Sequence, residues 1–177
     1  MTYSDWGRLI FFDTDERQVG GEEVTLAMIP KLGKQWKIVF DFKPSVPPPD
    51  DRFSPELSFS VDDDLVHALA FSRSKAILTF GIWIGLETDH QLKIGEWNTI
   101  EIALNEREYG RFFLSLSVGG KELGEMDLET WKPGTWRLGR YLEQEMFTNV
   151  EISLSYSVDD VPPDFPTIRR FLVIEKC

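Results

Sequence analysis

The sequence predicts an all-β protein in which two antiparallel sheets pack face to face, and the spacing of apolar residues is the reason. In strand-length segments such as residues 35–42, 111–118 and 150–158, apolar residues alternate with Ser, Thr, Glu or other polar ones. A period of two puts one face of each strand against a core and the other in water. Because no helical period separates these segments, a two-sheet sandwich accounts for them.

The first half of the chain contains six segments that we predict to be strands. They are residues 8–12, 23–29, 35–43, 56–61, 67–72 and 76–84. A proline-rich stretch, residues 44–55, interrupts the pattern. Since proline cannot donate to a sheet ladder, this stretch is predicted to be a loop at the rim of the sandwich.

The second half contains six more predicted strands, with two turn signals between them. The strands are residues 97–104, 111–118, 121–126, 135–138, 148–158 and 167–175. Gly119 and Gly120 predict a tight hairpin, because glycine readily takes the positive φ that such turns require. Residues 161–166 (VPPDFP) are predicted to form a second rim loop, and residues 141–146 are expected to form at most one helical turn.

Length and composition fit a single globular domain over residues 1–177. No repeat or linker divides the chain, and no apolar run approaches the ~20 residues that a membrane span requires. The single cysteine, Cys177, cannot form a disulfide within the chain, so the core must supply the stability. Residues 1–9 lack a signal-peptide pattern. We expect a secreted or extracellular protein, and a cytoplasmic location is the alternative.

The charge is strongly negative and the basic residues are scattered. With 30 acidic and 19 basic side chains, the formal net charge at pH 7 is −11. Nucleic acids and anionic membranes attract clustered Lys and Arg, so the sequence disfavours both as partners. An acidic domain of this kind suits a binding function, with divalent cations as candidate ligands.

Four motifs resemble those of one superfamily. They are KQWKIVFDFKP (residues 34–44), GEWNTIEI (residues 95–102), SVGGKEL (residues 117–123) and IRRFLVIE (residues 168–175). In order and spacing they resemble the concanavalin A-like lectin/glucanase jelly rolls, most closely the laminin G-like and pentraxin-like branch. The resemblance implies a jelly-roll sandwich. That superfamily contains lectins, adhesion domains and glycosidases, so it does not by itself choose a function.

Catalytic patterns are weak in this sequence. A glycosidase needs two carboxylates facing each other across a groove, whereas Glu101 and Glu151 stand singly on different predicted strands. His67 and His90 are isolated and have no nucleophilic serine motif or zinc spacing beside them. We therefore predict that no residue is catalytic.

Calcium is a candidate cofactor, because the resemblance implies rim sites built from hard oxygen ligands. Asp159, Asp160 and Asp164 are the first candidate ligands. Two other acidic groups, residues 62–64 and residues 13–16, are weaker candidates. The alternative is that all three are solvated turn residues, since Asp caps turns through its own backbone.

The strongest indication of a binding site is Trp83, which stands between Gly81 and Gly85 on the face opposite an apolar set. An outward indole flanked by glycines, which have no side chains, leaves an open surface on which a sugar ring can stack. The other predicted ligand-binding residues, expected on the same concave face, are Phe113, Glu101, Ser115, Glu151 and Ser153, with Ser155 beside them. The alternative is a covered or core tryptophan, which is how Trp36 and Trp97 are interpreted.

Together these observations predict a non-catalytic extracellular recognition module. Its ligand would be a glycan or an extracellular protein, bound on the concave sheet face or at the rim loops. The first alternative is a protein–protein or self-assembly domain, in which exposed aromatic side chains bury against another copy. The second alternative is a divergent glycosidase of the same fold.

Overall fold

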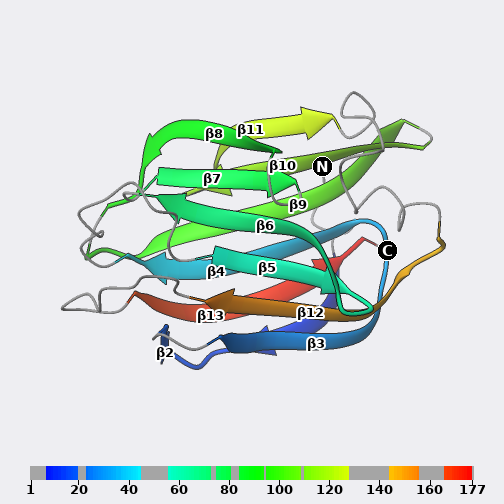
Figure 1. Cartoon of the computed structure of the whole chain (residues 1–177), viewed down its shortest axis with the longest axis horizontal. Helices are drawn as coiled ribbons and strands as arrows, with labels where there is room; N and C mark the ends of the chain where they lie inside the picture. Colours follow the sequence, from blue (N-terminus) through cyan, green and yellow to red (C-terminus); the bar gives the residue numbers. More distant parts are fainter. Residues whose placement is uncertain are drawn as a thin grey trace.

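The computed structural model describes residues 7–19, 23–44, 56–72, 75–80, 84–93, 95–108, 110–127, 144–155 and 166–176. Residues 56, 65–72, 75–80 and 84–91 are described by their backbone alone. Over these ranges the protein is all-β and contains no helix, so the described chain offers none that could cross a membrane. The strands form two layers (Figure 1).

One layer, sheet I, has the strand order β1-β13-β4-β9-β10-β11, with β2 also paired to β13. Its strands are β1 (Arg8–Asp13), β2 (Arg17–Gln18), β4 (Trp36–Lys43), β9 (Asn98–Glu108), β10 (Arg111–Val118), β11 (Lys121–Asp127) and β13 (Thr167–Glu175). Every neighbouring pair is antiparallel.

The other layer, sheet II, has the order β3-β12-β5-β6-β7-β8, again antiparallel throughout. Its strands are β3 (Val24–Leu32), β5 (Glu56–Val61), β6 (Asp64–Ser72), β7 (Lys75–Phe80), β8 (Ile84–Gln91) and β12 (Phe147–Ser155). In each sheet a strand late in the chain, β12 or β13, lies between two early ones. The two-sheet antiparallel sandwich predicted from the apolar spacing is therefore confirmed.

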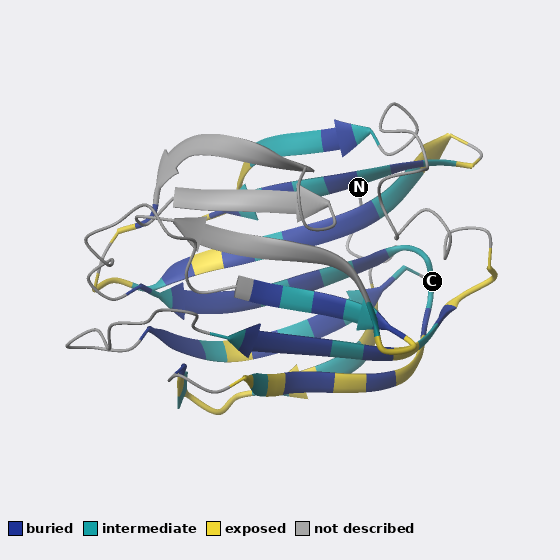
Figure 2. Cartoon of the chain, in the orientation of Figure 1, coloured by how far each residue is buried: buried dark blue, intermediate teal, exposed yellow. Residues whose placement is uncertain are grey.

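The core lies between the sheets and is built from the alternate residues that the sequence pattern selects. Six apolar residues of the predicted strands, which the alternation places on the inner face, are at most 1% exposed: Trp36, Phe40, Ile100, Leu114, Ile152 and Leu154. Trp36 stacks on Phe59 of the opposite sheet, with ring centroids 4.8 Å apart, and Phe147 meets Phe59 edge to face. Figure 2 shows the resulting alternation of buried and partly exposed residues along β10.

Most predicted strands are confirmed, but two predictions are wrong. Residues 76–84 are not one strand: β7 ends at Phe80, and Ile84 begins β8, which pairs antiparallel with β7. Residues 87–91, which lie between two predicted strands and are expected to be a loop because no strand is predicted there, belong to β8. An apolar run without proline or charge conceals a strand boundary, because both sides of the hairpin have the same composition.

Other expectations fall partly outside the described residues. Residues 144–146 are not helical, whereas the rest of the proposed helical turn, the 135–138 strand and the end of the 148–158 strand are not described. The Gly119–Gly120 turn is confirmed: φ is +61° and +81°, and Val118 pairs with Lys121 across it.

Candidate functional site

The outer face of sheet I contains a row of side chains whose sizes are set by strand register. Lys37 on β4 lies opposite Ala103 on β9, Ala103 opposite Ser115 on β10, and Ser115 opposite Glu125 on β11. Directly opposed residues on one face of a sheet are neighbours, so two small side chains lie between two long charged ones. This arrangement creates a depression in the sheet surface.

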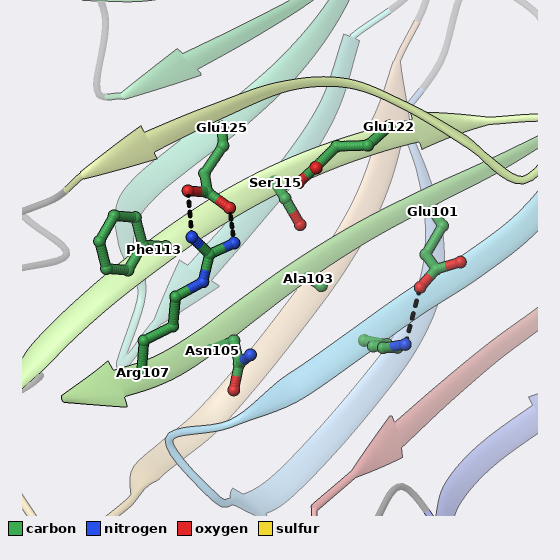
Figure 3. Close-up of a pocket in the computed structure, with 9 residues that line it drawn as sticks. Glu101, Ala103, Asn105, Arg107, Phe113, Ser115, Glu122 and Glu125 are labelled. Atoms are coloured by element: carbon green, nitrogen blue, oxygen red, sulfur yellow. Dashed lines mark hydrogen bonds and ion pairs between the residues drawn. The ribbon is translucent and has the colours of Figure 1, made fainter. Parts of the chain in front are cut away.

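A hollow of about 140 Å³ occupies this position. Its lining comes from four adjacent strands of sheet I, as Figure 3 shows: Lys37, Glu101, Ala103, Asn105, Arg107, Phe113, Ser115, Glu122 and Glu125. Ala103 is buried, and Ser115 beside it is half-buried.

Two ion pairs form walls of the hollow. The Nζ of Lys37 lies 3.0 Å from Oε1 of Glu101 on the neighbouring strand. Arg107 donates from both terminal nitrogens to the two carboxylate oxygens of Glu125 (Figure 3), reaching from β9 across β10 to β11. A bidentate pair of this kind fixes the orientation of both side chains. The walls are therefore held in place before any ligand arrives.

Phe113 lies at the end of the hollow with arginine side chains against its ring. The guanidinium carbons of Arg107 and Arg111 are 4.6 and 5.4 Å from the ring centroid. Arg111 is in turn hydrogen bonded through Nε to Asp127, at 3.1 Å. Cation–π contacts of this length are attractive. A sugar that stacks on Phe113 must share the ring with these groups.

The structure brings together three of the predicted ligand-binding residues and separates two others. Glu101, Phe113 and Ser115 all line the hollow. Glu151 and Ser153 lie on β12 in sheet II, where Glu151 accepts a hydrogen bond from Thr25 at 3.1 Å and Ser153 is buried. The prediction of one shared face is wrong, because alternation tells which side of a strand is polar but not which sheet the strand joins.

The interpretation of Trp97 as a core residue is also wrong. It is only half-buried, with the guanidinium carbon of Arg169 3.9 Å from one of its ring centroids and Nζ of Lys43 at 5.3 Å. Trp97 immediately precedes β9, in phase with the outward-facing Thr99 and Glu101. The expected core position belongs to its neighbour Asn98, which is buried.

Several predicted site residues lie outside the described part of the chain. These are Trp83 and the candidate calcium ligands Asp159, Asp160 and Asp164. Within the described residues, no group of three or more His, Cys, Asp or Glu side chains is arranged to hold a metal ion. The stacking and calcium predictions at those positions stay predictions.

The two other acidic groups have structural roles. Asp62 accepts hydrogen bonds from Oγ1 of Thr148 at 2.9 Å and from Nδ2 of Asn149 at 2.8 Å, which ties the β5–β6 turn to β12. Asp13 pairs with Arg17 at 2.7 Å and also accepts the backbone N–H of Asp15. These carboxylates brace turns, as the alternative interpretation of the sequence supposed.

Sequence reasoning missed six lining residues: Lys37, Ala103, Asn105, Arg107, Glu122 and Glu125. The glycine hairpin offers a partial signal, because a two-residue turn fixes the β10–β11 register near Val118. A bulge between Leu116 and Ser117 then shifts that register by one residue, so that Ser115 lies opposite Glu125 instead of Gly124. No local feature of the sequence predicts this bulge.

Comparison with known proteins gives fold-level similarity only. No family model matches the chain. No curated protein matches it either. Solved structures do match, with identities of about a tenth or less in the examples that follow, which show a shared fold and no more.

Three solved structures illustrate this likeness. Domain 4 of AbnA, a GH43 extracellular arabinanase from Geobacillus stearothermophilus, in complex with arabinotriose, has a TM-score of 0.54 and 11% identity over 96% of this chain and 93% of its own. The receptor binding domain of botulinum neurotoxin D has a TM-score of 0.62 and 10% identity, and the match covers 93% of this chain and 40% of that one. An endo-β-1,4-glucuronan lyase from the fungus Trichoderma reesei has a TM-score of 0.59 and 7% identity, and the match covers 93% of this chain and 79% of the lyase.

The chain also spans 26% of the length of a Trypanosoma rangeli sialidase, at a TM-score of 0.56 and 11% identity. The neighbours thus include binding domains and enzymes, and all contain a β-sandwich domain of this kind.

Proposed function

We propose that this chain is a non-catalytic recognition module that binds a glycan in the hollow on the outer face of sheet I. The observation that carries the proposal is the hollow itself, with its floor of Ala103 and Ser115 between ion-paired walls. Ligand sites combine a concave surface with a few polar groups held in fixed positions. At about 140 Å³ the hollow is smaller than the roughly 300–1,000 Å³ of drug-sized pockets, which suits one sugar ring of a longer ligand.

The comparisons support a glycan as the ligand. The arabinanase domain is similar over nearly its whole length, and its structure contains arabinotriose. The botulinum neurotoxin domain is a second binding domain with this sandwich. We further propose that the chain belongs to the concanavalin A-like, laminin G-like group of jelly rolls, which its sequence motifs resemble, and that it acts in an extracellular setting.

The non-catalytic part of the proposal rests on how the carboxylates of the hollow are used. Glu101 and Glu125 are each engaged by a cation, Lys37 and Arg107 respectively. Glycosidases instead direct a pair of carboxyl groups at the bond to be cleaved, one of them as a proton donor. The glycosidase alternative predicts hydrolysis of a bound glycan that Glu101→Gln abolishes, and our proposal predicts binding with no product.

Filling the hollow tests the proposed function. Ser115→Leu places a branched side chain on the floor, and we expect glycan affinity to fall at least about tenfold while the melting temperature stays near that of the wild type, since Ser115 faces outward. Titration calorimetry with glycans selected on an array measures the affinity. The matched control is Ser155→Leu, an outward serine on β12 of sheet II. Loss of binding in the control, but not in Ser115→Leu, would place the site on the other sheet.

A second candidate function, self-assembly, is favoured by one observation. Leu9 and Phe12 on edge strand β1 are 57% and 52% exposed, and they lie opposite Ile174 and Leu172 on the outer face of sheet I. An exposed apolar strip of this kind is typical of protein–protein contacts. Under this alternative, Phe12→Ser converts an oligomer into a monomer in light scattering, whereas the glycan proposal predicts no change in mass.

A further inference from the structure

The charge balance of the hollow indicates which class of glycan it accepts, and this inference rests on the proposed function. The lining contains two cations, Lys37 and Arg107, and three carboxylates, Glu101, Glu122 and Glu125. The local net charge is therefore −1, in a chain whose total is −11. An anionic ligand would meet like charge both in the hollow and from the molecule as a whole.

Both cations of the hollow, Lys37 and Arg107, already have a carboxylate partner. Both terminal nitrogens of Arg107 donate to Glu125, and its guanidinium also lies against the Phe113 ring. Lys37 is held by Glu101 at 3.0 Å. To bind a carboxylate or sulfate, either cation must give up a partner that is already in place. An anionic sugar therefore gains little from the positive charges of the site.

The polar groups left for a ligand include one carboxylate without an ion-pair partner among the described residues. Within the described residues, the side chains of Glu122, Ser115 and Asn105 make no hydrogen bond or ion pair to another side chain, and Oδ1 of Asn105 is a buried acceptor without a partner. Glu122 is exposed at the edge of the hollow. A carboxylate can only accept hydrogen bonds, whereas hydroxyl and ammonium groups donate them. Ser115 and Asn105 can both donate and accept, so the charged group of the described lining that has no ion-pair partner is the carboxylate of Glu122.

Among the described residues of the lining, Phe113 is the only aromatic one, and a stacking sugar would compete with Arg107 and Arg111 for its ring. Discrimination between sugars must then come from the polar groups and their charge.

We propose that the hollow selects a sugar ring that presents hydroxyl or ammonium donors and rejects one that carries a carboxylate or a sulfate. Glu122 is the group that distinguishes them. It lies beside the ligand without a cation of its own, so it attracts a protonated amine, accepts a hydrogen bond from a hydroxyl, and repels an acid.

The test uses matched tetrasaccharides that differ in one charge: neutral hexose, protonated hexosamine and uronic acid, in gluco, galacto and manno configurations. Titration calorimetry at low salt should rank hexosamine above hexose above uronate, by about fivefold per step, as one unit-charge interaction near a surface predicts. The ranking should narrow in 0.2 M salt, because salt screens exposed charges.

Two variants locate the effect. Glu122→Gln should remove the preference for hexosamine and reduce the rejection of uronate, while binding of the neutral sugar stays within about twofold. The matched control, Glu145→Gln, changes an exposed carboxylate just before β12 of sheet II and should leave the ranking intact. An unchanged ranking in Glu122→Gln would overturn the role given to Glu122.

The outcomes separate this inference from the proposed function. Binding at the Ser115-dependent site that is tightest for the uronate would overturn the charge selection and leave the glycan-binding proposal standing. If the folded protein binds none of the series, both the proposed function and this inference are wrong.

Discussion

At the residue scale, one buried amide fixes the entry into β9, the strand that contributes most residues to the hollow. Nδ2 of Asn98 lies 3.0–3.3 Å from the carbonyl oxygens of Phe42, Lys93 and Glu96, and its Oδ1 accepts the backbone N–H of Lys93 at 3.3 Å. Asn98 is only 9% exposed. Its side chain thus satisfies backbone groups that folding removes from water, which few other side chains could do.

We expect Asn98→Ala to lower the free energy of unfolding by about 1–3 kcal/mol, because it leaves buried carbonyls without donors. Asn98→Asp keeps an acceptor but loses the N–H donors, so it should cost at least as much. Urea denaturation measures both. Glu96→Ala, at an exposed residue of the same turn, is the control and should stay within about 0.5 kcal/mol. An Asn98→Ala variant as stable as this control would contradict the role given to the amide.

At the element scale, the β10–β11 hairpin positions Glu122 and Glu125 over the hollow. Its turn residues, Gly119 and Gly120, both have positive φ, and the N–H of Gly119 donates to the carbonyl of Thr99 at 2.9 Å. A Cβ atom at Gly119 would meet nothing within 4 Å. Any cost of a side chain there is therefore a backbone cost, set by the left-handed conformation.

This gives a matched pair of substitutions at one position. Gly119→Asn should leave the melting temperature nearly unchanged, because asparagine is a favoured first residue in turns of this type. Gly119→Val should lower the free energy of unfolding by about 1–2 kcal/mol, since a β-branched residue strongly resists positive φ. Thermal unfolding followed by circular dichroism compares the two. Equal losses in both variants would mean that the turn changes conformation when a side chain is added.

At the scale of the whole molecule, the high negative charge bears on the calcium prediction. With a net charge of −11, the acidic side chains repel one another in the folded protein, and a bound cation would reduce that repulsion. The candidate ligands Asp159, Asp160 and Asp164 lie outside the described residues, so calcium binding is a matter for solution measurement.

If the segment that contains Asp159, Asp160 and Asp164 binds calcium, the melting temperature should be higher in millimolar Ca²⁺ than in the presence of a chelator, because any ligand of the native state stabilises it. Asp160→Asn should reduce that rise, because it removes a charged oxygen ligand. The control is Asp63→Asn in the β5–β6 turn, where φ is +65° and asparagine fits equally well. Indistinguishable melting curves in calcium and in chelator would rule out the metal site.

The sequence alone determined which side of a strand such as β4 faces the core. Trp36, Phe40 and Phe42 share one face of β4 and are buried, because that face packs against the core and loses its water. Asp41, between two of them, is buried as well. The hairpin at Gly119 was likewise determined locally, since few residues other than glycine adopt its backbone conformation without strain.

The tertiary structure decided which polar faces belong together. Glu101 and Glu151 have the same sequence signature, yet one lines the hollow and the other lies on the opposite sheet. Pairing of strands far apart in the chain assigns each strand to its sheet, and the bulge after Leu116 then places Glu125 beside Ser115. A candidate site composed of side chains from four strands exists only once that pairing has formed, because no single strand contains more than a part of it.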